Sequence, residues 1–328
     1  MSTKKIIAVV GATGTQGSSV ARAFLSLPNW HVRCLTRSPS SKPSQALVNE
    51  GAEVAQADLN KPESLRAAFA GVHAIFLNTD YWEPYRQAVN SGKDATTRVK
   101  FGYDTEVQLG KNAIDAALEV PTLERFVYSA LGPMHAASGG KYPYSYHWET
   151  KAHLVDYIES TKLRDVASFI YIGAYLTNQF LYPKLDNDTG EYALVLPASK
   201  RTRFPIINTA RSTGPFVRAL IEEEAAGTKL LAYDEYLSFE EIINTWSKVT
   251  GRQAVFVQMG MQDMLEKFGV PIEVLGAPAY LDDFSYCAGV SNVIEPSQLK
   301  SRVAVRSFEE SLRGLEAEIL LGTKDWAY

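Results

Sequence analysis

The stretch Ile6-Ile-Ala-Val-Val-Gly-Ala-Thr-Gly-Thr-Gln-Gly17 indicates how the chain begins to fold. Its first five residues are apolar and predict a strand that is buried on both faces, as in a parallel sheet. Residues 18–27 follow with apolar side chains at helical spacing, namely Val20, Phe24 and Leu27. A strand, a glycine-rich turn and a helix in this order bring the N-terminus of the helix against a pyrophosphate group. The stretch therefore predicts a dinucleotide site, and the alternative is an ordinary βα turn without a ligand.

The glycines of this turn follow the spacing G-x-x-G-x-x-G. Gly11 permits a tight turn, Gly14 allows a phosphate to approach the backbone, and Gly17 allows the helix to pack closely on the strand. We therefore expect the cofactor to contact the loop at Gly11, Thr13, Gly14, Thr15, Gln16 and Gly17.

The composition of the 328 residues, 46% apolar and 21% charged, is that of an ordinary soluble globular protein. A net charge of −4 offers no basic surface to nucleic acid or to an anionic membrane. No apolar run approaches the roughly 20 residues that span a bilayer, and none near the start is long enough for a signal peptide. Cys34 and Cys287 are expected to be buried thiols in a reducing compartment. We expect a cytoplasmic protein that binds a small molecule and, for lack of ligand spacing among histidines and cysteines, no metal.

Apolar runs and helical patterns alternate over the first half of the chain. This alternation predicts a right-handed, doubly wound parallel sheet, that is, a Rossmann-type α/β fold. The expected strands are 31–36, 53–57, 74–78, 125–129 and 167–172, and the expected helices are 43–50, 62–70, 107–118 and 148–160.

The alternation stops after residue 173. We expect residues 1–173 to form a dinucleotide-binding domain, and residues 174–328 to form mainly a smaller α+β lobe with some segments returning to the sheet. Ligands of open α/β sheets bind at the carboxyl ends of the strands, so this lobe is expected to close a substrate pocket there. Its expected strands are 192–196 and 230–233, and its expected helices are 211–224, 239–250, 261–288 (mainly helical) and 307–320.

The end of the second strand decides which nicotinamide cofactor is expected. A site specific for NAD normally carries an acidic residue there, to bind the ribose 2′-hydroxyl. This chain has Thr36-Arg37-Ser38 instead, and Arg37 with Lys42 could hold a 2′-phosphate through charge-assisted hydrogen bonds. The alternative for Arg37 is a solvated surface charge. We therefore predict NADP(H), with Asp58 and Leu59 near the adenine and Asn78 and Thr79 near the nicotinamide ribose. The alternative for Asp58 is a residue that only forms the turn after the third strand.

The glycine loop, Arg37 and Asn78-Thr79 together resemble the NmrA-like family, which consists of atypical short-chain dehydrogenases/reductases. Residues 205–210 (Pro-Ile-Ile-Asn-Thr-Ala) and 213–215 (Thr-Gly-Pro) are similar to a later motif of that family. The resemblance covers most of the chain and implies a Rossmann domain, a smaller C-terminal domain and a cleft between them. It implies either a reductase or a regulator, since the family contains both.

The resemblance also implies where catalytic groups would lie. The wider superfamily uses a Tyr and a Lys four residues apart on one helix, with a Ser at the end of the fifth strand. This chain has Ser129 and Lys151 in those places, but His147 occupies the Tyr position. Three hypotheses follow: His147 donates the proton; Tyr144 donates it, if the helix extends back past Pro143; or the substrate is an iminium ion and needs no acid.

Simpler roles are also open. Lys151 could merely hold the ribose, and His147 could be a hydrogen-bonded histidine of the core or surface. Four aromatic residues follow the fourth and sixth strands and would either contact a substrate or pack the two lobes together: Tyr81, Trp82, Tyr175 and Phe180.

Two functions remain. The first is an NADPH-dependent oxidoreductase that reduces a C=N, C=C or C=O bond of a small metabolite by hydride transfer in the cleft. The alternative is a non-catalytic NADP(H)-binding redox sensor, or transcriptional regulator, that acts through a protein partner.

Overall fold

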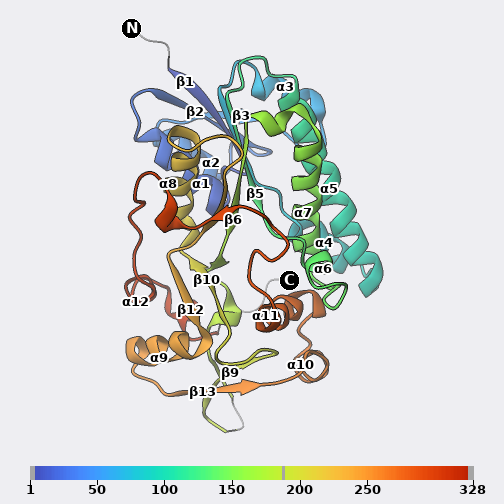
Figure 1. Ribbon diagram of the computed structural model, residues 1–328, viewed down its shortest axis with the longest axis vertical. Coiled ribbons are helices and arrows are strands. Elements are labelled where there is room, and N and C mark those ends of the chain that lie inside the picture. Colours follow the sequence, from blue (N-terminus) through green and yellow to red (C-terminus); the bar gives the residue numbers. More distant parts are fainter. Residues whose placement is uncertain (1–3, 187–188, 324–328) are drawn as a thin grey trace.

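The computed structural model describes residues 4–186 and 189–323. Its centre is an eight-stranded sheet with the order β14-β11-β6-β5-β4-β1-β2-β3 (Figure 1). Every pair of neighbouring strands in it is parallel, which confirms the predicted doubly wound sheet. The strands are β1 (Lys5–Val10), β2 (Trp30–Thr36), β3 (Glu53–Gln56), β4 (Ala74–Leu77), β5 (Arg125–Ala130), β6 (Ala167–Ile172), β11 (Lys229–Ala232) and β14 (Val293–Ile294).

Helices cover both faces of this sheet, which explains why its central strands are almost entirely apolar. The buried side chains form two large clusters, one on each face. One face carries α1 (Thr15–Leu25), α2 (Lys42–Asn49) and α8 (Thr209–Glu222); the other carries α3 (Pro62–Phe69), α5 (Ala95–Leu118) and α7 (Tyr146–Ser160) (Figure 1).

Close packing of α8 on α1 explains the Thr-Gly-Pro motif at 213–215. A Cβ atom on Gly214 would lie 2.1 Å from the carbonyl oxygen of Ser19, so only glycine fits. The backbone N–H of Gly214 also donates to Oγ of Ser19 at 3.0 Å. Helix α8, which follows residue 173 in the sequence, is in this way fixed to the helix that begins at the phosphate loop.

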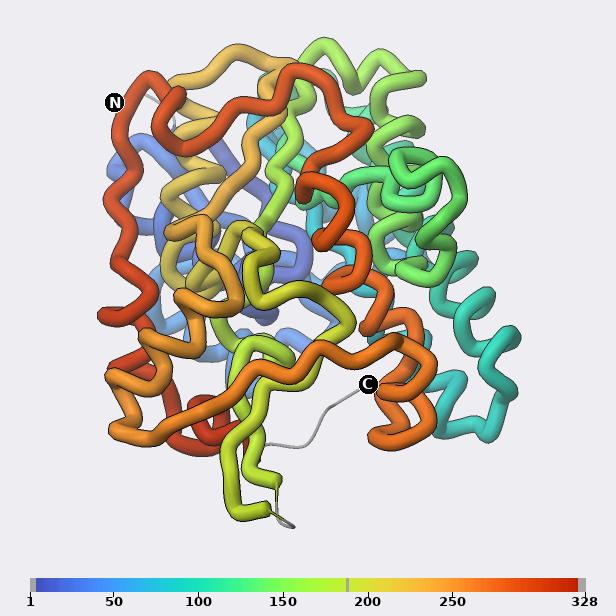
Figure 2. The backbone as a smooth tube through the Cα atoms, turned by 60° about the horizontal axis from the view of Figure 1, so that its bottom comes forward, coloured from blue at the N-terminus to red at the C-terminus, as the bar shows by residue number. Residues whose placement is uncertain are grey.

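The chain after β6 leaves the main sheet and returns to it as β11 and β14. Between these passages and after β14, it forms two small sheets and a set of helices below the carboxyl ends of the main strands (Figures 1 and 2). One sheet contains β7 (Ala174–Tyr175), β10 (Arg203–Ile207) and β12 (Glu235–Ser238); the other contains β8 (Lys184–Leu185), β9 (Tyr192–Leu196) and β13 (Ala254–Gln258). The helices are α9 (Phe239–Thr250), α10 (Met261–Phe268), α11 (Ile272–Asp283), α12 (Phe308–Leu312) and α13 (Ala317–Leu320). The domain boundary at residue 173 stays a prediction.

Some predicted elements differ from those observed. The helix expected at 107–118 begins at Ala95, because the Asp94 side chain caps it by accepting a hydrogen bond from the Thr97 N–H. The single helix expected at 307–320 was wrong, since α12 and α13 are separate and Gly314 lies between them. Other elements were not expected, among them α4 (Trp82–Asn90), α6 (Met134–Ala137) and the 3₁₀ turns at Lys162–Asp165, Gln179–Leu181 and Pro296–Gln298.

Among the described residues, no helix combines the length and apolar character needed to cross a bilayer.

Candidate functional site

A cavity of about 680 Å³ lies at the carboxyl ends of the central strands, where the chain leaves β1 toward β2 on one side and β4 toward β5 on the other. This is the position at which open α/β sheets bind ligands. Most of the predicted site residues line this cavity: Gly11, Thr13, Gly14, Thr15, Gln16, Arg37, Asn78, Thr79, Tyr81, Trp82, Ser129, His147, Lys151, Tyr175 and Phe180. Five do not line it: Gly17, Lys42, Asp58, Leu59 and Tyr144.

The glycine loop forms one end of the cavity. Gly11 has a φ of +72°, a left-handed conformation that glycine adopts without strain. Gly14 is the N-cap of α1 and supplies no side-chain cap, so the first turn of the helix stays accessible to an anion. Gly17 has a packing role instead of a contact in the cavity, because a Cβ there would lie 2.2 Å from the Gly11 carbonyl oxygen.

Arg37 directly follows β2 and lines the cavity, as expected from its position in the sequence. Its Nη2 donates a hydrogen bond of 2.8 Å to Oε2 of Glu83, a residue in the first turn of α4. This hydrogen bond raises the pKa of Arg37 above its usual value, so the side chain stays a cation. Lys42 and Asp58, also predicted for this end, do not line the cavity. Lys42 is exposed at the start of α2, and Asp58 accepts hydrogen bonds from Asn60, although its charge still acts on Arg37.

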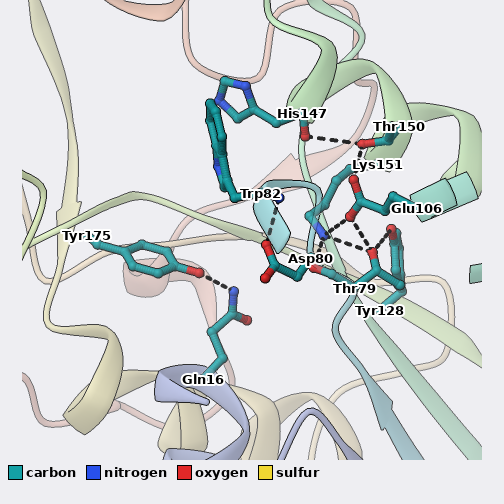
Figure 3. Close-up of polar contacts among 10 residues, drawn as sticks. All are labelled: Gln16, Thr79, Asp80, Trp82, Glu106, Tyr128, His147, Thr150, Lys151 and Tyr175. Atoms are coloured by element: carbon teal, nitrogen blue, oxygen red, sulfur yellow. Dashed lines mark hydrogen bonds and ion pairs between the residues drawn. The ribbon is translucent and has the colours of Figure 1, made fainter. Parts of the chain in front are cut away.

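Lys151 reaches the cavity from α7 but is surrounded by protein acceptors (Figure 3). Its Nζ donates to the Thr79 carbonyl at 2.7 Å, to the Thr79 hydroxyl at 2.9 Å and to Oε1 of Glu106 at 2.9 Å. An ammonium group has three N–H donors, so these contacts use all of them. Lys151 therefore fixes the end of β4 against α5 and α7.

Glu106 is the counter-ion in this cluster and is completely buried, with 0% of its side chain exposed. Its Oε1 also accepts from the Thr79 hydroxyl at 2.6 Å, and its Oε2 accepts from the Thr150 hydroxyl at 2.5 Å. The carboxylate has a donor on each oxygen, which is what a buried charge requires. The Thr79 hydroxyl further contacts the Tyr128 hydroxyl at 3.3 Å, which extends the cluster to β5 (Figure 3).

His147 lies one helical turn before Lys151, beside the ring of Trp82. The two ring centroids are 5.0 Å apart at an interplanar angle of 43°. His147 lines the cavity, but its Nδ1 is buried and no described residue bonds to it. Burial, aided by the positive charge of Lys151, lowers the pKa of His147 from 6.5 to about 3. The imidazole is therefore neutral at neutral pH and holds no readily donated proton.

The structure does not bring Tyr144 to the site. Helix α7 begins at Tyr146, so it does not extend back past Pro143, and Tyr144 is 36% exposed outside the cavity lining. Ser129 is at the end of β5 as expected, buried and lining the cavity.

The far end of the cavity is apolar. Helix α11 presents Val274, Ala277, Pro278 and Leu281, which recur at the spacing of one helical face. Aromatic residues complete these walls, among them Trp82, Trp148, Phe180 and Tyr286.

Tyr175 lines the cavity and contacts the glycine loop. Its hydroxyl accepts a hydrogen bond of 2.6 Å from Nε2 of Gln16 (Figure 3). Burial raises the pKa of Tyr175, so the hydroxyl stays protonated. Of the predicted aromatic residues, Tyr81 is the most deeply buried; its ring packs against Gly102 of α5, where an added Cβ would lie 2.9 Å away.

Several residues of the site were missed from the sequence. Glu106 continues the buried stripe Val99, Gly102, Gly110 and Ala113 on α5, so a correct helix start would have revealed an acid on an apolar face. Asp80, Glu83, Arg86 and α11 follow no motif and had no comparable signal. Among the described residues, no group of histidines, cysteines and acids could hold a metal ion.

Comparison with known proteins finds matches over nearly the whole chain. A model of the NmrA-like family matches residues 3–312. The chain is 28% identical to an NmrA-like family domain-containing oxidoreductase of Aspergillus hancockii, over 99% of this chain and 96% of the relative.

Two solved structures share the fold. NmrA, a negative transcriptional regulator in complex with NADP, has a TM-score of 0.69 and 23% identity over 96% of both chains. A triphenylmethane reductase of Citrobacter sp. has a TM-score of 0.67 and 18% identity, over 97% of this chain and 99% of that one.

Proposed function

The chain belongs to the NmrA-like family, and from this premise we propose that it is an NADPH-dependent reductase of a small, largely apolar metabolite. One observation carries the proposal: a single cavity is lined by the phosphate loop at the start of α1, by Lys151 and by the apolar face of α11. Pockets that are apolar with a few placed polar groups are typical of small-molecule sites. The oxidoreductase named above supports the same function.

Each residue of the cavity has a proposed part. The first turn of α1 binds the pyrophosphate, and Arg37 binds the 2′-phosphate. Lys151 holds the end of β4 in place and adds positive charge beside the ribose. Bound NADPH supplies a hydride. The face of α11 excludes water and orients the acceptor against the hydride.

The state of His147 and Lys151 favours a particular kind of acceptor. His147 is neutral, and Lys151 has all of its N–H donors bound within the protein. An iminium ion, R₂C=N⁺R₂, takes up a hydride at carbon and becomes the amine R₂CH–NR₂ without any proton. We therefore propose a C=N bond as the preferred substrate group, ahead of C=C and C=O bonds, which must gain a proton as well as a hydride.

The experiment is NADPH oxidation across a panel of stable iminium salts, enones and ketones. Ala277→Trp fills the apolar end of the cavity, so it should abolish turnover while NADPH binding is kept. Val255→Trp adds the same side chain at an exposed position of β13 and is the matched control. Turnover that survives Ala277→Trp would place the substrate elsewhere.

The same state of His147 and Lys151 also supports a second function, that of a non-catalytic NADP(H) sensor. A protein that only senses NADP(H) needs the phosphate loop but no proton donor, and NmrA itself is named a regulator. If NADPH binds, no member of the panel is reduced, and bound NADPH changes association with a protein partner, the sensor function replaces the reductase.

A further inference from the structure

Glu83 brings an acidic side chain to the end of β2, although no acidic residue stands there in the sequence. The end of β2 carries Arg37 in place of the acidic residue typical of NAD sites, but the fold brings Glu83 to it from α4, 46 positions along the chain. We infer that Glu83 is a specificity-determining residue, which competes with a 2′-phosphate for Arg37 and accepts the 2′-hydroxyl of NADH. This inference rests on the proposed cofactor site.

The geometry allows this exchange of partners. The Arg37 side chain is 61% exposed and the Glu83 side chain 38% exposed, so both can reorient at little cost. The backbone of Arg37 has a separate contact, since its carbonyl accepts from Nε2 of Gln56 at 3.3 Å. The guanidinium can therefore leave Glu83 for a phosphate while its backbone stays in place.

Other acidic side chains near Arg37 affect the competition between Glu83 and a 2′-phosphate for its guanidinium. Asp58 and Asp80 also act on Arg37 through their negative charge, and Arg86 lies 3.8 Å from Asp80. A 2′-phosphate adds up to two further negative charges. It therefore meets repulsion from these acids unless Arg37 turns to it, whereas a neutral 2′-hydroxyl needs only the acceptor that Glu83 provides.

Glu83→Gln tests the inference because it changes the two cofactors in opposite directions. Exposed ion pairs contribute little, so we expect NADPH to bind about three- to five-fold more tightly. We expect NADH to bind about two- to five-fold more weakly, since the amide is a poorer acceptor for the 2′-hydroxyl than a carboxylate. Dissociation constants by calorimetry at fixed ionic strength measure both changes.

Glu50→Gln is the matched control. Glu50 accepts from Arg22 at 2.8 Å and is also 38% exposed, but Arg22, unlike Arg37, does not line the cavity. The substitution Glu50→Gln removes the same charge from the protein, and it should leave the affinities for NADPH and NADH unchanged. If Glu83→Gln strengthens the binding of both cofactors equally, the effect comes from the lost negative charge in general, and the inference is overturned.

Two further outcomes separate this inference from the proposed function. If NADPH binds and Arg37→Ala weakens it, but Glu83→Gln changes neither cofactor, the cofactor site stands and the role of Glu83 is refuted. If the folded wild-type protein binds neither cofactor, the proposed function fails and the role of Glu83 fails with it.

Discussion

Nζ of Lys151 lies 2.9 Å from Oε1 of Glu106, and together these residues form an ion pair within the protein core beside the cavity. The acid is wholly buried, whereas the lysine keeps a small exposed area on the cavity side. The pair fastens α7 to α5, and Thr79 adds the end of β4 to it. A residue expected to bind cofactor is thus also part of the structural core.

Lys151→Ala should therefore destabilise the protein. Removing one partner leaves the Glu106 carboxylate buried and uncompensated, which typically costs about 3–5 kcal/mol of unfolding free energy. Lys100→Ala is the control, because Lys100 pairs with Asp104 at 2.6 Å on the exposed surface of α5 and should cost no more than about 0.5 kcal/mol. Urea unfolding of both variants measures the difference, and equal losses would contradict the role given to the buried pair.

His147 should make stability depend on pH. Its pKa is 6.5 in an unfolded chain and about 3 in the native state, where burial and Lys151 keep it neutral. Below pH 6.5 the unfolded state binds a proton that the native state does not, so stability falls as the pH drops from 6.5 toward 3. Between these two pKa values, His147 changes the free energy of unfolding by up to about 1.4 kcal/mol per pH unit.

The comparison is between wild type and His147→Gln. Their difference in unfolding free energy should be constant above pH 7, and it should shift in favour of the variant as the pH falls. A difference that stays constant down to pH 4 would mean that His147 takes up a proton in the native state.

His147→Phe should leave turnover nearly intact. A general acid at this position would contribute roughly 10²–10⁴-fold to the rate, but a histidine that is neutral at pH 7 has no such proton to give. Phenylalanine also preserves packing against Trp82. Steady-state rates from pH 6 to 9 test this, and a hundred-fold loss would identify His147 as the acid.

Much of the main sheet could be predicted because its central strands are largely apolar runs separated by helical patterns. The phosphate loop and Arg37 were equally visible, since their geometry depends on neighbours in the sequence. Glu83 and Glu106 were not, because their partners lie 46 and 45 positions away and only the folded chain brings them together. The break between α12 and α13 was missed because the apolar pattern continues across a local turn.

Gly14 and Gly17 should respond differently to substitution. A Cβ at Gly14 would lie 3.3 Å from the Gly11 carbonyl, which a small shift relieves, but it would also obstruct the approaching phosphate. Gly14→Val should thus lose NADPH binding with stability nearly unchanged. Gly17→Ala places a Cβ 2.2 Å from the same oxygen and should cost roughly 1–3 kcal/mol through overpacking.

Gly260→Val is the control for Gly14→Val. Gly260 is likewise the N-cap of a helix, α10, and a Cβ there would also meet an oxygen at 3.3 Å, but it lies outside the cavity. Its NADPH affinity should be that of wild type. Normal NADPH binding by Gly14→Val would show that the loop is not the phosphate site.

The most direct measurement is to follow a deuterium label from NADPH, deuterated at C4 of the nicotinamide, into the product of a stable iminium salt. The account predicts that wild type and His147→Phe both place deuterium on the former C=N carbon of the product. With Ala277→Trp, the amount of deuterated product should fall to that of a reaction without enzyme. The contradicting result is NADPH that binds, with no enzyme-dependent deuterium in the product of any iminium, enone or ketone tested.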